Sequence, residues 1–273
     1  MIALEQLLRV PYVDSENGFD ISPNGAKVAF SWNLTGRWEI YEASTDGASA
    51  PQQISRDTGA KFTPKYSPNG ACLAYLVDFD GSENFHLFVH DLAAGQPVDL
   101  TPNIDFTLRP NFSWSPDGAE IAFLSSRADH FSVYIMPVKG GEKRLALDVG
   151  RPAWGVRWSP NGHWLAVEVE WQGQDHAVFI VPLDGSAAYQ LGEGDTPLNA
   201  THPAWSPDGQ RLAFCADPRG WYDIGIYNLE CRTVEWVSGG NSDDTSPAWA
   251  AAGRLAYIHR RGALTWLAVQ QPG

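Results

Sequence analysis

The 273-residue chain carries 32 acidic and 19 basic side chains, a net charge of −13, and 44% of its residues are hydrophobic. This negative balance argues against nucleic-acid binding, because neutralising phosphates requires a basic surface. The first 13 residues lack a basic start followed by an apolar stretch, and no segment approaches the ~18 uncharged apolar residues of a membrane span. We therefore expect a cytoplasmic protein with no membrane contact.

A phrase of the form S-P-[DN]-G recurs along the chain. "WSPDG" stands at 114–118 and again at 205–209. The marker serines are spaced 45, 48, 44 and 47 residues apart, at Ser22, Ser67, Ser115, Ser159 and Ser206. A degenerate sixth copy of the phrase begins at Ser246 and carries Ala250 in the serine position. Six copies account for the whole chain, and a period in this range is typical of a repeat architecture.

Each phrase predicts a turn between two antiparallel strands, because proline sets the first φ, Asp or Asn tolerates the second, and glycine takes the positive φ. After each turn, large apolar residues alternate with an alanine, and this is the period of a strand. The six alanines are Ala29, Ala74, Ala122, Ala166, Ala213 and Ala256. A third strand follows in every copy, and a fourth follows in five of them.

Four strands in about 45 residues are typical of a propeller blade. The sequence predicts an all-β fold, a single domain over residues 1–273. This domain is a six-bladed β-propeller of four-stranded antiparallel blades that begin near residues 18, 62, 110, 153, 202 and 246. The last blade has no fourth strand of its own. We expect part of Leu7 to Val13 to supply it, with Pro11 tolerated at an outer edge.

The phrase W-S-P-D-G followed by x-I/L-A-F resembles the WD-like repeat of the TolB type over roughly residues 14–270. That repeat is similar to the propellers of TolB, of tricorn protease and of the prolyl oligopeptidase family. The opening "LEQLLRVPYV" is similar to that of bacterial prolyl oligopeptidase relatives. In the peptidases, the resemblance implies a propeller that covers an α/β-hydrolase domain. This chain has no G-x-S-x-G and no residues left for such a domain, so no catalytic residue is carried over.

On one face of the predicted propeller, the loops between blades emerge together with the loops between second and third strands. These loops hold 19 acidic and 9 basic residues, a balance of −10, and the rest of the chain holds 13 and 10. Loops on a rigid scaffold often carry binding residues. We expect this acidic loop face to prefer cationic or amino-bearing partners, such as a peptide or a protein. The alternative is that these loops are acidic only because exposed loops are generally rich in charged residues, and that they bind no partner.

Eight loop residues are candidates for ligand binding. They are Trp171, Glu170, Trp221, Arg219, Arg109, Arg151, Asp243 and Asp244. The two tryptophans fall outside the repeating aromatic positions and lie beside charged residues, so they could anchor a peptide or a sugar ring, or be partly buried against a neighbouring loop. The arginines are candidates for orienting a carboxylate, and the acidic residues for holding an amine.

We expect no cofactor, metal or catalytic residue. The segment "DFDGSE" (78–83) begins like a calcium loop but lacks the later ligands, and D-G is also an ordinary hairpin turn. Glu168 and Glu170 lie about 7 Å apart on one side of a strand. Such a spacing suits a glycosidase carboxylate pair, although a solvated hairpin edge explains it more simply. Cys215 follows an apolar strand and is expected to be a small core residue.

The function expected from these features is a non-catalytic propeller that binds or gates peptides or a protein partner. It would be the propeller module of a prolyl-oligopeptidase-like or a TolB-like protein. In the first case, it would be part of a serine peptidase. Two alternatives stay open: a propeller enzyme that acts on carbohydrate, and a pure assembly scaffold. The sequence does not determine the oligomeric state.

Overall fold

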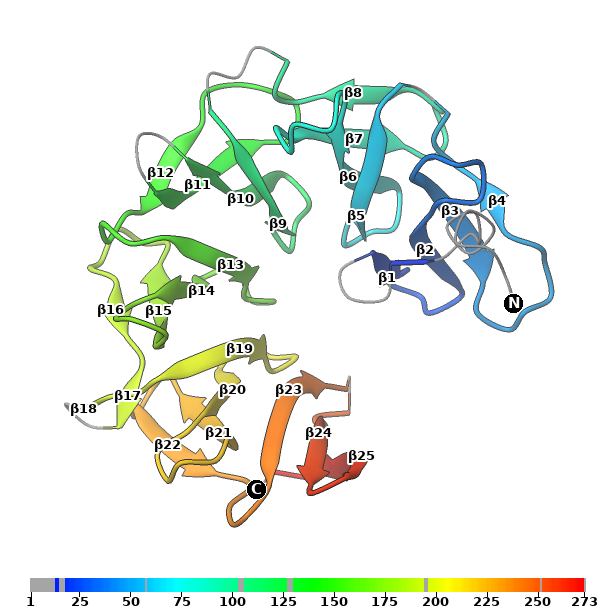
Figure 1. Cartoon of the computed structure of the whole chain (residues 1–273). Coiled ribbons are helices and arrows are strands. Elements are labelled where there is room, and N and C mark those ends of the chain that lie inside the picture. Colours follow the sequence, from blue (N-terminus) through cyan, green and yellow to red (C-terminus); the bar gives the residue numbers. More distant parts are fainter. Residues whose placement is uncertain are drawn as a thin grey trace. The chain divides into compact units, whose positions relative to one another are not determined.

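The computed structural model describes residues 13–14, 18–56, 58–102, 106–126, 130–193, 196–250 and 252–272. The chain divides into two compact units (Figure 1). The first comprises residues 1–110 with 137–142, and the second comprises residues 111–136 with 143–273. Each unit is a succession of antiparallel sheets, and each copy of the sequence repeat forms one sheet.

Two four-stranded sheets lie in the first unit, each with its strands in sequence order. The first sheet consists of β1 (Phe19–Ile21), β2 (Lys27–Trp32), β3 (Glu39–Ser44) and β4 (Gln52–Gln53). The second consists of β5 (Ala60–Tyr66), β6 (Cys72–Asp78), β7 (His86–Asp91) and β8 (Pro97–Asp99).

The other four repeat copies form the sheets of the second unit, and the division between the units falls within β9. The third copy folds as β9 (Leu108–Trp114), β10 (Glu120–Ser126), β11 (Phe131–Pro137) and β12 (Arg144–Leu147). The fourth folds as β13 (Ala153–Trp158), β14 (Trp164–Glu170), β15 (His176–Pro182) and β16 (Tyr189–Gln190). A short hairpin of β17 (Gly192–Glu193) and β18 (Thr196–Pro197) precedes the fifth, which is β19 (Ala200–Trp205), β20 (Arg211–Ala216), β21 (Asp223–Asn228) and β22 (Thr233–Trp236). The sixth is β23 (Asp243–Trp249), β24 (Leu255–Arg261) and β25 (Leu264–Gln270).

This arrangement confirms the predicted fold class, an all-β chain whose six antiparallel sheets are the blades of a β-propeller. Five of the sheets have four strands, and the sixth has three within the described residues.

The repeated phrase folds as a self-contained turn between the first and second strands of a sheet. In the third copy, the hydroxyl of Ser115 donates to Asp117 Oδ1 at 2.6 Å and accepts the N–H of Glu120 at 2.9 Å. Gly118 closes the turn by donating its N–H to the Ser115 carbonyl, and its φ of 69° is one that glycine adopts without strain. The sixth copy keeps the backbone bond, from Gly253 to Ala250, although alanine has no hydroxyl.

The alternating alanines lie where neighbouring sheets pack face to face. Ala29, Ala74, Ala122, Ala166 and Ala213 are all fully buried. In the second unit, Ala166 joins the apolar cluster that also contains residues of β15, β19 and β20. Side chains larger than alanine would force the sheets apart, because protein interiors are close-packed.

The predicted closure of the sixth blade by Leu7 to Val13 falls mostly on residues 7–12, which lie outside the described residues. The last member of this segment, Val13, forms an isolated antiparallel bridge with Trp32 in the first sheet. The bridge concerns Val13 alone, so the expectation that part of Leu7 to Val13 completes the sixth blade stays a prediction. The side chains of β25 remain largely exposed, including Leu264, Trp266 and Leu267.

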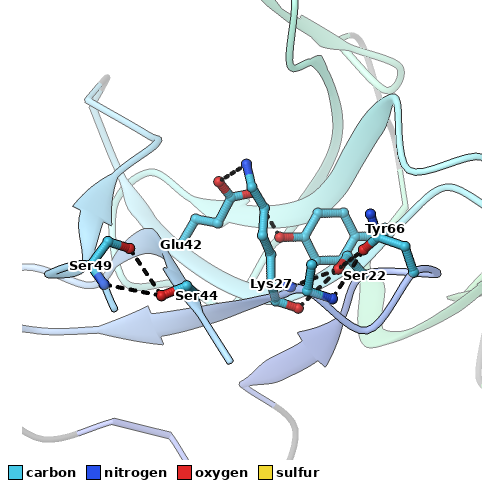
Figure 2. A network of polar contacts seen from close by, with 8 residues as sticks. Ser22, Lys27, Glu42, Ser44, Ser49 and Tyr66 are labelled. Atoms are coloured by element: carbon cyan, nitrogen blue, oxygen red, sulfur yellow. Dashed lines mark hydrogen bonds and ion pairs between the residues drawn. The ribbon is translucent and has the colours of Figure 1, made fainter. Parts of the chain in front are cut away.

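Polar side chains link the first two sheets to each other (Figure 2). The Tyr66 hydroxyl of β5 donates to Glu42 Oε1 of β3 at 2.8 Å, and Lys27 Nζ of β2 lies 2.6 Å from Glu42 Oε2. The Tyr66 N–H also donates to the Asp20 carboxylate at 2.8 Å. Burial raises the pKa of the Asp20 carboxyl, and the bond from Tyr66 acts in the opposite direction. Asp20 thus connects the innermost strands of two successive sheets.

Candidate functional site

A cavity of about 530 Å³ opens along the innermost strands of the second unit. Its walls come from β9, β13, β19 and β23, the first strands of four successive sheets, which lie on the same side of the unit in Figure 1. Glu168 adds a wall residue from β14. Concave surfaces built from a rigid scaffold with a few polar groups are where proteins usually bind ligands.

Four lining residues share one position of the repeat, four places before the turn serine or its replacement Ala250. They are Asn111, Gly155, His202 and Ser246. His202 has a φ of 53° and Ser246 a φ of 56°, and each precedes a proline. A positive φ lies in the left-handed region of backbone conformations, and placing a residue other than glycine there costs on the order of 1–3 kcal/mol. A following proline disfavours this conformation further.

These two residues sit in β-bulges. The pairing of β19 with β20 shifts register between Thr201 and Ala204, and that of β23 with β24 shifts between Thr245 and Ala248. A bulge leaves one residue outside the ladder and redirects its polar groups. The N–H of His202 accordingly donates to the carboxylate of Glu168 at 3.0 Å instead of to a neighbouring strand.

Glu168 binds the next sheet with both of its carboxylate oxygens. Oε1 accepts the Thr201 hydroxyl at 2.5 Å and lies 3.3 Å from His176 Nδ1, and Oε2 accepts the His202 N–H. The prediction that Glu168 belongs to a solvated hairpin edge is therefore incomplete. This carboxylate instead fastens β19 to β14.

Arg157 projects from β13 into the same cavity. Its side chain is exposed to solvent, although nearby protein groups desolvate the guanidinium in part. This desolvation lowers the pKa of the Arg157 guanidinium, and the negative charge of Glu168 partly offsets the effect. Within the described part of the chain, the guanidinium makes one hydrogen bond, from Nη1 to the Val156 carbonyl at 3.4 Å.

Tryptophans hold the cavity walls in place. Trp205 Nε1 donates to the Arg157 carbonyl at 3.0 Å, and Trp249 Nε1 donates to the Ala204 carbonyl at 3.1 Å. Each indole thereby ties its own sheet to the inner strand of the preceding sheet. Trp154 is 41% exposed at the rim and donates Nε1 to Glu170 at 3.3 Å.

This last contact places one of the eight predicted residues, Glu170, at the edge of the cavity through Trp154. Its neighbour Trp171 lies elsewhere. The indole of Trp171 packs against Phe179, with ring centroids 5.4 Å apart, beside the buried apolar cluster of the third and fourth sheets. Of the two possibilities that the sequence left open for Trp171, partial burial is the one observed.

Trp221 and Arg219, the two residues predicted in the β20–β21 loop, have different environments in the structure. Trp221 is 44% exposed. Arg219 is engaged within its own sheet, where its Nη2 lies 2.6 Å from Asp223 Oδ2 and donates to the Ser238 carbonyl at 3.2 Å. Its guanidinium also lies 5.6 Å from the Trp236 ring centroid. These partners connect the arginine to its own sheet and already engage three of its five N–H donors.

The two other predicted arginines do not line the cavity. Arg109 lies in β9, half-buried, and Arg151 is exposed just before β13.

The two predicted aspartates lie at the start of β23. Asp243 Oδ1 accepts the Tyr222 N–H at 3.3 Å. Asp244 is fully buried, and its Oδ1 lies 2.6 Å from His259 Nδ1. Neither carboxylate lines the cavity. Both aspartates bond Tyr222, the residue after Trp221, so the structure brings them next to that tryptophan but not to Trp171.

Two other motifs act as structural elements. Asp78 accepts the N–H groups of Asp80, Gly81 and Glu83, so the calcium-like segment is a turn organised by its first aspartate. Among the described residues, no group of three or more His, Cys, Asp or Glu side chains is arranged to hold a metal ion. A search of the same residues finds no helix with the length and apolar character needed to span a bilayer.

Cys215 is a core residue, as predicted. It is fully buried in the cluster that joins the fifth and sixth sheets, and burial raises the pKa of its thiol to about 12. Thiolates, and not thiols, are the reactive form of cysteine. We therefore expect Cys215 to react slowly in the folded protein.

In the native protein at pH 8, iodoacetamide is expected to modify the exposed Cys231 first and the half-buried Cys72 more slowly, because burial also raises the pKa of the Cys72 thiol. Cys215 should react only after unfolding in guanidinium. Peptide mass spectrometry of timed samples measures all three rates. Native labelling of Cys215 at the rate of Cys231 would show that the cluster opens readily.

Arg157 and His202 line the cavity but are not among the residues predicted from the sequence. One signal was present: two places before the turn serine, the copies on either side of Arg157 carry Ser113 and Ala204. Within the last four copies, Arg157 is the one charged residue at this repeat position, although the first two copies carry Asp20 and Lys65 there.

Comparisons with known proteins agree with the fold. Residues 113–272 match the family PD40, described as the TolB beta propeller domain. The uncharacterized protein Atu1656 of Agrobacterium fabrum is 26% identical over 240 residues, which cover 80% of this chain and 77% of that protein. Dipeptidyl-peptidase 5 of Porphyromonas gingivalis is 26% identical over 263 residues, 89% of this chain and 38% of that one.

Among solved structures, a puromycin-hydrolyzing peptidase of Mycobacterium tuberculosis aligns with a TM-score of 0.75 at 17% identity, over 98% of this chain and 45% of that chain. The chain thus spans less than half the length of each of these two peptidases. The family match covers more than half of the present chain, and it confirms the resemblance that the repeated phrase indicated. The chain belongs to the PD40 family of TolB beta propeller domains.

Proposed function

We propose that this chain is a non-catalytic propeller that binds peptide segments in the cavity of its second unit. The observation that carries the proposal is the cavity itself. It measures about 530 Å³ and is lined by indole, guanidinium, imidazole and hydroxyl groups on strands that are fixed from both sides. Such a mixture of flat apolar surfaces and directed polar groups suits a peptide backbone and its side chains.

A further fact supports a peptide as the ligand. The relatives of this chain include a dipeptidyl-peptidase, whose name states that it acts on peptides.

Filling the cavity tests the proposal. Ala248 is exposed and lines the wall, so Ala248→Phe places a ring in the cavity without disturbing a buried contact. We expect this variant to lose at least about 10-fold in affinity for peptides, because the ring excludes the ligand from its site. Equilibrium dialysis of the whole chain against a pool of random N-acetylated octapeptides, read by mass spectrometry, measures the change.

The matched control is Ala187→Phe. Ala187 is exposed between β15 and β16, and it does not line the cavity. This variant adds the same ring to the same unit and should bind peptides like the unmodified protein. If no peptide binds the unmodified protein, or if Ala248→Phe leaves binding intact, the cavity is not a peptide site.

A further inference from the structure

We propose that the cavity recognises a carboxylate group on its peptide ligand, and that Arg157 is the residue that binds it. The inference rests on the proposed function, because it names the chemical group by which the same cavity selects among peptides. The shared chemistry is a carboxylate, which a peptide carries at its free C-terminus or on an aspartate or glutamate side chain.

Arg157 has hydrogen-bonding capacity that the protein does not use. A guanidinium has five N–H donors in a planar fork that matches the two oxygens of a carboxylate. Within the described residues, only one of these donors is used, in a long 3.4 Å bond to a backbone carbonyl. The remaining donors face a cavity that solvent and a ligand can enter.

The carboxylates of the protein that lie near Arg157 are bonded to other partners. Glu168 lines the same cavity but is held by Thr201 and His202 of the next sheet, and it forms no ion pair with Arg157. Glu170 at the rim accepts the Trp154 indole N–H. Arg144 and Arg219, by contrast, each pair with a carboxylate of their own sheet. Arg157 thus forms no ion pair among the described residues, although the charge of Glu168 acts on it from a greater distance.

The environment of the charge points the same way. Desolvation by nearby protein groups lowers the pKa of the exposed Arg157 guanidinium, and the charge of Glu168 acts in the opposite direction. A carboxylate placed against it supplies further compensation. Charge-assisted hydrogen bonds of this type are about twice as strong as those between neutral groups.

The cavity also leaves space next to Arg157. At the repeat position of Arg157, the next two sheets along the chain carry Ala204 and Ala248, and all three residues line the cavity. The small side chains leave room in front of the guanidinium. The hydroxyl of Ser246, on the wall beyond them, is exposed and adds a further hydrogen-bond donor.

The test uses the whole chain and three pools of N-acetylated octapeptides whose random positions hold only uncharged residues. The first pool has a free C-terminal carboxylate, the second a C-terminal amide, and the third a C-terminal amide with one aspartate per peptide. Equilibrium dialysis gives the affinity of each pool. We expect the amide pool to bind about 10- to 100-fold more weakly than at least one carboxylate pool, and the stronger of the two identifies the source of the group.

The same measurements on Arg157→Gln should reduce the carboxylate pools to the affinity of the amide pool. Arg157→Lys, which keeps the charge but not the fork, should lie between the two. Both variants leave the Arg157 carbonyl in place for Trp205, so the wall is retained. Arg144→Gln removes an equal charge from an exposed pair on the same unit and should change nothing.

The outcomes separate the two proposals. If all pools bind equally and Ala248→Phe removes them all, peptide binding stands and carboxylate recognition is wrong. A carboxylate preference that survives in Arg157→Gln also overturns the role of Arg157. If no pool binds, the proposed function fails, and the inference fails with it.

Discussion

Replacing Lys61 with methionine is expected to lower the free energy of unfolding by about 3–5 kcal/mol. Lys61 and Glu39 are both almost completely buried, and Lys61 Nζ lies 3.0 Å from Glu39 Oε2. Methionine keeps the apolar stem and removes the charge. The Glu39 carboxylate would then be left with Arg37 and Ser55 as partners in a buried setting. Chemical denaturation followed by tryptophan fluorescence measures the loss.

The control for this prediction is Lys27→Met, which removes the same charge from an exposed pair. The Lys27 side chain is 55% exposed and lies 2.6 Å from Glu42. Exposed pairs contribute about 0–1 kcal/mol, because water screens the charges. A loss of the same size in both variants would mean that the burial of the Glu39–Lys61 pair does not determine its contribution.

The second large effect is expected at Phe214, where alanine should lower the free energy of unfolding by about 3–5 kcal/mol. Phe214 is fully buried in the cluster between the fourth and fifth sheets. Its ring lies directly over Gly225 on the neighbouring strand β21, so close that a Cβ on Gly225 would come within 2.5 Å of the ring. The ring therefore occupies the space that a side chain at residue 225 would need.

This packing predicts coupling between the two positions. In the unmodified protein, Gly225→Ala should cost about 1–3 kcal/mol, because the ring must move. In the Phe214→Ala background, the same change should cost much less, since the space is then empty. A double-mutant cycle by denaturation measures the difference. Strict additivity of the two substitutions would show that the ring and the glycine do not share this space.

The fold was predictable because its determinants are local. The turn at Ser115 is complete within six residues. The alanine of the strand that follows, Ala122, is fully buried, and its position in the strand is set by the alternating pattern of its own repeat copy. Each repeat copy carries the same turn residues and the same alternating strand pattern. A correct prediction for one copy therefore holds for all six.

The site was less predictable because it depends on bulges. Counting alternate residues through "THPAW" (201–205) gives the wrong face after the register shift between Thr201 and Ala204. Charge alone also misled the choice of candidates, since Arg219 and Asp244 are used by neighbours within the fold. Arg157 came from a strand, whereas the candidates had been sought in loops.

The repeat position shared by Asn111, Gly155, His202 and Ser246 has a consequence for how such a protein can evolve. These four residues face the cavity, while the serines and alanines that build the blades lie elsewhere in each copy. Under the proposed function, variation at Gly155, His202 and Ser246 would change the groups that a peptide meets, whereas Asn111 also accepts the Val156 N–H and so belongs to the scaffold. Randomising only the first three codons would then alter the ligand and leave the blades unchanged.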